Sequence, residues 1–231
     1  MRQIRGKRIA LIPQNPLSSL NPVLTIGEQV AEPLIKHYGV TKREAWKKAR
    51  EMLTQVGFQQ GEAYLKRYAN EFSGGMRQRI AIAMALISEP DILIADEPTT
   101  ALDVTIQAQI LKLLHHIVRS TNTSLLLITH DLAVVSEMCD KIGVMYAGQL
   151  VEWGDKQQVL RTPCHPYTEA LIAAIPDKRT EQGFMTIPGQ PPKLTEVPQH
   201  CHFAERCKYV DDACRKGSIA DRMNSEGRGM R

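Results

Sequence analysis

The order of apolar and polar residues along the chain predicts alternating strands and helices. Residues 8–12, 91–95 and 124–129 are short, almost continuous apolar runs with the length of buried strands in a parallel sheet. Between the last two runs, apolar residues recur on one helical face; they are Ile106, Ile110, Leu113, Leu114 and Ile117. Because strands alternate with helices over short links, we expect an α/β fold whose parallel sheet is covered on both faces.

A largely helical segment interrupts this alternation. Its first helix is expected over residues 26–37, with a kink or break at Pro33 because proline lacks the backbone donor. Thr41 and Glu44 then have the spacing of a capping box, which marks the start of a second helix. Gly57 follows the last apolar position of that helix and is a natural stop.

A third helix of this segment is expected to begin at Ser73, a good N-cap residue, and to run to about Ser88. Residues 80–87 are apolar on most sides, which predicts that this helix is buried. Residues 15–22 are rich in Pro, Ser and Asn and predict a loop. Residues 26–88 therefore form a helical insertion into the α/β fold.

The C-terminal part of the chain has weaker patterns. Residues 141–154 predict a hairpin with Ala147-Gly148 at the turn, and residues 166–175 predict a short helix. From Pro176 onward Pro and Gly recur, so little regular structure is expected. Residues 217–231 are polar and are expected to be disordered.

Composition adds few constraints. The 231 residues suit one domain plus a tail, and a net charge of +4 permits contact with an anionic surface without requiring one. No apolar run reaches the ~18 residues that span a bilayer, and the N-terminus has no secretory signal pattern. We therefore expect a cytosolic chain, in which five cysteines, an odd number, argue against a disulfide framework.

The first candidate site lies at the end of the second apolar run, where Asp96 and Glu97 follow directly. In parallel sheets the carboxyl ends of strands face the ligand crevice. A carboxylate there can hold Mg²⁺, which suits Asp96, and the next one can orient or deprotonate a water, which suits Glu97. The alternative is a pair of solvent-facing acids before Pro98.

A second candidate site is Ser73-Gly74-Gly75 at the start of the buried helix. Glycines let backbone N–H groups approach a phosphate, and the helix N-terminus adds its positive dipole end. The alternative is a plain serine cap with a Gly-Gly turn. Ser73–Gln78 also resembles the signature segment of ABC transporter ATPases, and with Asp96-Glu97 following shortly after, this resemblance favours the phosphate site.

Four segments, taken in order, resemble the ATP-binding cassette of ABC transporters. They are Phe72–Arg79, Ile92–Pro98, Ala101–Asp103 and Ile128–Asp131. The resemblance implies a P-loop NTPase fold with a helical insertion and an irregular C-terminal tail. It implies Mg²⁺ at Asp96 and Gln14, catalytic roles for Glu97, His130 and Gln14, and ATP contacts from a further set. That set is Ser73, Gly74, Gly75, Gln78 and Asp103.

Four further segments narrow the resemblance to the oligopeptide, dipeptide and nickel importer ATPases, over roughly residues 5–214. They are Gln14–Pro22, Met145–Gly148, His165–Leu171 and Ile187–Pro192. The resemblance implies an ABC-type ATPase that binds ATP and Mg²⁺ and powers the import of peptides or a related small solute. Its domains would be a core ATPase subdomain over 1–25 and 89–175, a helical signature subdomain over 26–88, and a tail over 176–231.

The same resemblance implies the partners. They are a second ATPase subunit in a homo- or heterodimer, two integral membrane permease subunits and, indirectly, a periplasmic or extracellular solute-binding protein. The chain would act peripherally at the cytoplasmic face of the inner membrane. A soluble ABC ATPase for DNA repair or translation would need a second cassette or a long coiled coil, so no nucleic acid is expected.

The glycine-rich phosphate loop G-x-x-x-x-G-K-S/T occurs nowhere in this sequence. Two hypotheses therefore stay open. The chain is an ATP-hydrolysing subunit, or it is a truncated, non-catalytic cassette. Such a cassette would only contribute its signature segment, Ser73–Gln78, to the ATP site of a partner, or would have no function. Family members carry a strand, the loop and a helix ahead of the first residue, and they fill the middle of the sheet. Without them we expect exposed apolar surface and an unpaired strand edge.

Cys201, Cys207 and Cys214 lie close together in the tail. Some members of the resembled family bind an iron–sulfur cluster there, and such clusters usually need four thiolates. Cys164 or an external ligand would have to complete the set. The alternative is three reduced, partly buried thiols.

Overall fold

The computed structural model describes residues 3–100, 102–175, 186–192, 200–217, 222–223 and 228–230. Contacts divide the chain into two compact units, Met1–Val134 and Val135–Arg231. The first unit contains the helical insertion and the first strands, and the second contains residues 135–175 and the tail; the expected functional subdomains stay a prediction.

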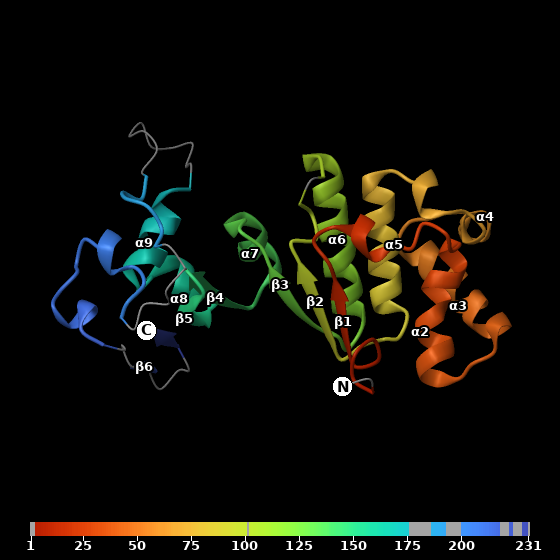
Figure 1. Ribbon diagram of the computed structural model, residues 1–231, viewed down its shortest axis with the longest axis horizontal. Coiled ribbons are helices and arrows are strands. Elements are labelled where there is room, and N and C mark those ends of the chain that lie inside the picture. Colours follow the sequence, from red (N-terminus) through yellow and green to blue (C-terminus); the bar gives the residue numbers. More distant parts are fainter. Residues whose placement is uncertain are drawn as a thin grey trace. The chain divides into compact units, whose positions relative to one another are not determined.

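The first unit contains a three-stranded parallel sheet of β1 (Ile9–Ile12), β2 (Ile92–Asp96) and β3 (Ser124–Ile128), in the order β1-β2-β3. Leu11 pairs with Ile94, which in turn pairs with Leu126. The predicted α/β class and all three predicted strands are confirmed. The carboxyl ends of the strands lie at one edge of the sheet, which is where the site residues follow (Figure 1).

Only one face of this sheet is covered within the described residues. Ala10, Leu93 and other inward side chains are buried, whereas the opposite face leaves Leu11 57%, Leu126 54% and Ile128 46% exposed. The expectation of a sheet covered on both faces, with a buried third strand, is therefore wrong for the described part of the chain. β3 lies at the edge of this sheet, so no described neighbouring strand shields it.

The helical insertion packs around α2. Its helices are α2 (Ile26–Tyr38), α3 (Lys42–Gln55), α4 (Gly61–Leu65) and α5 (Gly74–Leu86). α2 contacts each of the other three. The Thr41–Glu44 capping box forms as predicted, and Thr25 and Glu28 form a second one that begins α2. Pro33 lies inside α2 without breaking it.

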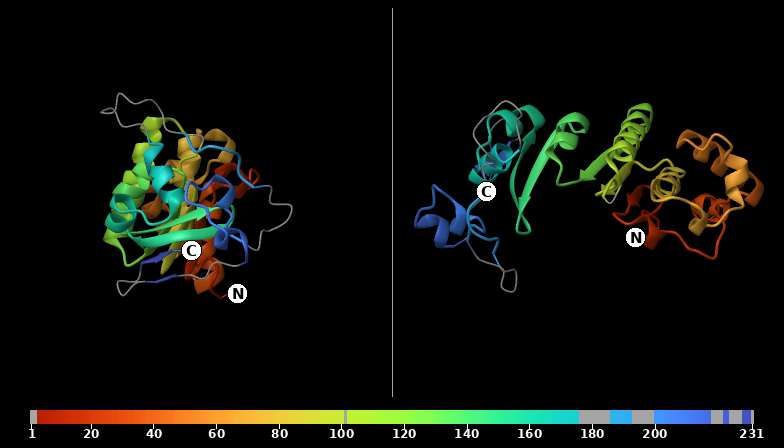
Figure 2. Two further views of the ribbon diagram at one scale, coloured as in Figure 1. Left: turned by 90° about the vertical axis from the view of Figure 1, so that its left-hand side faces the viewer. Right: turned by 90° about the horizontal axis from the view of Figure 1, so that it is seen from above.

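The expected loop over 15–22 contains a one-turn helix, α1 (Pro16–Ser19). Proline suits the first position of a helix, because the donor that it lacks has no partner there. α5 contacts β1, and α5 and α6 (Val104–Ser120) lie together on one side of the sheet (Figure 2). The buried side chains of α6 are Ile110, Leu114 and Ile117, as the helical spacing predicted.

The second unit is built on the hairpin of β4 (Lys141–Tyr146) and β5 (Gln149–Asp155). Ala147 and Gly148 form its turn with φ of 45° and 79°, which confirms the predicted turn. The other helices are α7 (Leu132–Met138), which crosses the boundary between the units, α8 (Lys156–Arg161) and α9 (Pro166–Ala173). Short 3-10 turns occupy Ala204–Arg206 and Ala213–Arg215.

The last residues add two short strands to this hairpin. β7 (Gly229–Met230) pairs antiparallel with β5, and β6 (Arg222–Met223) pairs with β7. The expectation of disorder over 217–231 is thus wrong for these four residues, while most of that segment lies outside the described residues. A Cβ on Gly229 would overlap the Trp153 ring, so this close pairing requires glycine.

In the part of the chain that the structure describes, no helix is both long and apolar enough to cross a membrane.

Candidate functional site

Glu97 occupies a strained backbone position immediately after β2. Its φ is +43°, a left-handed conformation that residues with a side chain rarely adopt. Two backbone hydrogen bonds support it: the Glu97 N–H donates to the Ile128 carbonyl at 2.9 Å, and the Glu97 carbonyl accepts from the Thr100 N–H at 3.1 Å. Strain of this kind often accompanies a side chain that must point in a set direction.

The Glu97 carboxylate contacts two other predicted site residues, Gln14 and His130. Gln14 Nε2 donates to Oε2 at 2.7 Å, and His130 Nδ1 lies 3.2 Å from Oε1. Thr100 adds a contact that the sequence analysis missed, with Oγ1 donating to Oε2 at 2.8 Å. The sequence signal for it is a hydroxyl three residues after an acid, at turn spacing.

This set of donors favours the ionised form of Glu97. The Thr100 hydroxyl has the largest effect, and with His130 and Gln14 it lowers the pKa of Glu97 below the usual range, against a smaller opposing effect of burial. An ionised carboxylate is an acceptor on both oxygens. Glu97 can therefore accept a hydrogen bond from a water molecule. Asp96 lies beside it at the end of β2 and is half-buried.

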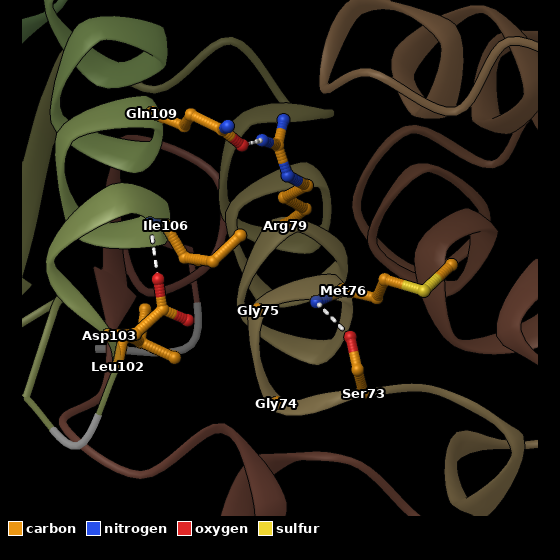
Figure 3. A pocket seen from close by; sticks show the side chains of 9 residues that line it. All are labelled: Ser73, Gly74, Gly75, Met76, Arg79, Leu102, Asp103, Ile106 and Gln109. Carbon is orange, nitrogen blue, oxygen red and sulfur yellow. Dashed lines mark hydrogen bonds between the residues drawn. The ribbon is translucent and has the colours of Figure 1, made fainter.

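A second cluster lines a pocket of about 400 Å³ between the start of α5 and the start of α6 (Figure 3). It contains the predicted residues Ser73, Gly74, Gly75 and Asp103. Both helices are capped here: Ser73 Oγ accepts from the Met76 N–H at 3.4 Å, and Asp103 Oδ1 accepts from the Ile106 N–H at 3.0 Å. Ser73 and Asp103 thus act as helix caps, and capping does not exclude a ligand role for them. The other lining residues are Met76, Arg79, Leu102, Ile106 and Gln109.

The two glycines of this pocket serve different purposes. A Cβ on Gly75 would lie 2.7 Å from Ile106 Cγ2, so Gly75 is needed for α5 to pack against α6. A Cβ on Gly74 would only touch Leu102 Cδ2 at 3.8 Å, an ordinary contact. Of the two, Gly74 is therefore the position whose backbone a phosphate could approach closely.

Arg79 joins three segments at the rim of the pocket. Its Nη1 donates to the Val56 carbonyl at 2.9 Å, just after α3. Its Nη2 donates to Gln109 Oε1 on α6 at 2.9 Å, as Figure 3 shows. Gly57 leaves space for the guanidinium, because a Cβ there would lie 2.7 Å from Nη1. Arg79 thereby links the helical insertion to the helix that follows Asp103.

Gln78, which the resemblance placed among the ATP contacts, does not line this pocket. It is 1% exposed on α5, and its Nε2 has no hydrogen-bond partner among the described residues. Helical geometry explains the difference, because consecutive helix positions point about 100° apart, so the neighbouring Arg79 reaches the pocket and Gln78 points inward.

The tail cysteines are not arranged as a metal site. The Cys201 N–H donates to the Cys214 carbonyl at 3.3 Å, and burial raises the pKa of the Cys201 thiol, which favours the neutral form. No three His, Cys, Asp or Glu side chains in the described ranges are grouped so that they could hold a metal ion. The geometry therefore fits reduced, partly buried thiols at Cys201, Cys207 and Cys214.

Two family models match the chain. The ABC transporter model matches residues 1–100, and the model of the oligopeptide/dipeptide transporter C-terminal region matches residues 151–214. Among solved structures, the chain is similar to the ATP-binding cassette MJ0796, determined as a dimer in a post-hydrolysis state bound to ADP and Pi. That similarity has a TM-score of 0.59 and 31% identity over 67% of this chain and 66% of that one.

Curated relatives are longer than this chain. The dipeptide transport ATP-binding protein DppD of Bacillus subtilis is 51% identical over 90% of this chain, which spans 62% of that protein. The oligopeptide transport ATP-binding protein OppD of Salmonella typhimurium is 47% identical over 93% of the chain, which spans 64% of it. OppD of Haemophilus influenzae is 45% identical over the whole chain, which spans 71% of it. The chain therefore belongs to the family of ABC transporter ATP-binding proteins for oligopeptides and dipeptides.

Proposed function

We propose that this chain is an ATP-binding and ATP-hydrolysing subunit that powers peptide import. The convergence of Gln14 and His130 on the Glu97 carboxylate, at the carboxyl end of β2, supports this proposal most directly. Each of these side chains follows a different strand of the parallel sheet, at the edge where such sheets bind ligands. The names of the relatives, which are transport ATP-binding proteins, support the same function.

In this proposal the residues at the end of β2 divide the chemistry. Glu97 orients a water toward the terminal phosphate of ATP and accepts its proton, and His130 and Gln14 hold the carboxylate in place. Asp96 and Gln14 would hold Mg²⁺, since carboxylate and amide oxygens suit that ion and one or two protein ligands suffice beside phosphates. When bound, Mg²⁺ neutralises charge on the phosphate oxygens.

The pocket at the start of α5 is proposed to act on a nucleotide held by a second subunit. Ser73 and Gly74 would offer a hydroxyl and backbone N–H groups at the positive end of α5, which suit phosphate. Asp103, on the opposite wall, would contact the neighbouring subunit. The dimeric state of the similar solved cassette supports an arrangement in which two chains share their sites.

The remaining partners follow from the family. Two integral membrane permease subunits would bind the chain, and a periplasmic or extracellular solute-binding protein would deliver the peptide to them. The chain would then act as a peripheral subunit at the cytoplasmic face of the inner membrane.

A second candidate function rests on the pocket at the start of α5, which Ser73 and Gly74 line. The chain could place these two residues on a nucleotide that its partner binds, without hydrolysing ATP at its own Glu97 site. It would then be a non-catalytic subunit.

Isothermal titration calorimetry of the purified chain, once with Mg-ATP and once with Mg-free ATP, measures ATP affinity and separates the two functions. Micromolar affinity that depends on Mg²⁺ and weakens in Asp96→Asn supports the catalytic subunit. The second function predicts that the chain alone does not bind ATP. It also predicts that ATP hydrolysis appears only on mixing with a second ATP-binding subunit and is lost in Ser73→Arg. Wild-type behaviour of Glu97→Gln in every hydrolysis assay would refute the assignment of Glu97.

A further inference from the structure

The three side chains on the Glu97 carboxylate differ in how they reach it. Gln14 and His130 come from segments 83 and 33 residues away, whereas Thr100 lies in the turn that Glu97 itself begins. Gln14 and His130 therefore depend on the packing of the whole sheet. Thr100 depends only on a turn of four residues.

This turn holds Glu97 at two points. The Thr100 N–H donates to the Glu97 carbonyl at 3.1 Å, and the Thr100 hydroxyl donates to Oε2 at 2.8 Å. The first contact fixes the backbone of Glu97, whose φ is +43°, and the second fixes the direction of its side chain. The backbone and the carboxylate of one residue are thus tied to one neighbour.

The oxygen that Thr100 holds is the one that Gln14 also reaches. Gln14 Nε2 lies 2.7 Å from Oε2, so Oε2 receives both donors and Oε1 is left facing His130. A carboxylate oxygen has two lone pairs and accepts both donors without competition. The hydroxyl therefore holds the carboxylate plane in the orientation in which one oxygen meets Gln14 and the other meets His130.

We infer that Thr100 is a positioning residue that directs the Glu97 carboxylate onto Gln14 and His130. The inference extends the proposed function, because it concerns the orientation of the carboxylate that acts on water. A purely structural role for Thr100 would be to stabilise the turn. In that case any β-branched side chain of the same size would serve as well as threonine.

Nitrogen-15 NMR of the full chain separates these roles without requiring hydrolysis. The signals to follow are the Gln14 side-chain amide and the His130 ring, in wild type, Thr100→Ser and Thr100→Val. Glu97→Ala gives the reference for complete loss of both contacts. We expect Thr100→Val to move both signals toward that reference and Thr100→Ser to stay near wild type. Wild-type signals in Thr100→Val, or equal shifts in both variants, would overturn the inference.

A kinetic arm connects this result to ATP hydrolysis. In an assembly that hydrolyses ATP, Thr100→Val should lower kcat about tenfold, the loss expected for one hydrogen bond to a charged group, and leave KM for ATP unchanged. Thr100→Ser should restore most of the rate. An inactive wild-type assembly would count against the proposed function alone, because the NMR comparison still decides the role of Thr100.

Discussion

Replacing Arg228 with methionine should destabilise the second unit by about 2–4 kcal/mol, because it leaves a buried carboxylate without its cation. The Glu152 side chain is 0% exposed, and Arg228 Nη2 donates to its Oε1 at 2.6 Å. The other contacts on this carboxylate include the backbone N–H groups of Cys164 and His165, which donate at 2.9 Å each. Glu152 thus joins β5 to the start of α9 and to the final strand.

The magnitude follows from these contacts. Removing one partner of a buried ion pair typically costs about 3–5 kcal/mol. Two backbone donors remain on Glu152 in the variant, and the Arg228 side chain is 11% exposed, so the cost should be about 1 kcal/mol lower, which gives about 2–4 kcal/mol. Glu152→Gln in the Arg228→Met background should recover part of the loss, because the amide carries no charge.

The pH dependence has a definite sign. Burial by itself would raise the pKa of Glu152, but hydrogen bonds from Arg228 and from the Cys164 and His165 N–H groups outweigh it, and the pKa lies below its usual value. A depressed folded-state pKa contributes stability above the unfolded value, and that stability is lost as pH falls through the folded value. Loss of Arg228 raises the pKa of Glu152 in the variant, so the stability difference between wild type and Arg228→Met should be largest at neutral pH and shrink steadily as the pH falls to 4 and below.

Hydrogen exchange of the β5 backbone amides is the suitable assay, because a chain with two units need not unfold in one step. Faster exchange in Arg228→Met than in wild type, reduced by the added Glu152→Gln, is the expected result. Unchanged exchange at neutral pH would refute the reasoning. So would a loss of the same size at pH 4 and pH 7, because the effect would then not come from the carboxylate charge.

Three further variants test the first unit. Gly57→Ala should lower the free energy of unfolding in denaturant by about 1–3 kcal/mol, since the φ of Gly57 is +100° and the new Cβ would clash with Arg79 Nη1. An equal loss in an Arg79→Ala background would contradict the contribution of this clash. Thr41→Ala should cost about 1 kcal/mol through loss of the cap of α3, and Thr41→Ser should not. Leu126→Lys should change unfolding by less than about 0.5 kcal/mol and reduce aggregation in light scattering; a large destabilisation would show that this sheet face is covered.

Local signals in the sequence predicted the elements well. Caps at Thr41 and Ser73 mark helix starts because the hydrogen bonds involved span only three residues. The turn at Ala147-Gly148 likewise depends on neighbouring residues alone. The strand over 91–95 was predictable for a similar reason, since an unbroken apolar run of that length suits a strand in a sheet.

Predictions failed where distant contacts decide the outcome. Polar residues near the C-terminus indicated disorder, yet Gly229 pairs with β5 and places Arg228 on the buried Glu152. Likewise the break that was one expected outcome at Pro33 is absent, because the packing of α2 against α3 and α5 outweighs the missing backbone donor. Neither contact can be predicted from the pattern of the residues that neighbour it in the sequence.

The sequence by itself determined which side chains are available for chemistry and where along the chain they stand: Asp96 and Glu97 after a strand, Ser73 at the start of a helix. Only the tertiary structure decided which of them meet. Gln14, Glu97 and His130 converge because parallel pairing brings the ends of β1, β2 and β3 to one edge. The tertiary structure also placed Gln78 in the interior and left Leu126 exposed. The physical reason is that burial and convergence depend on neighbours tens of residues away, whereas capping and turns depend on the next three or four.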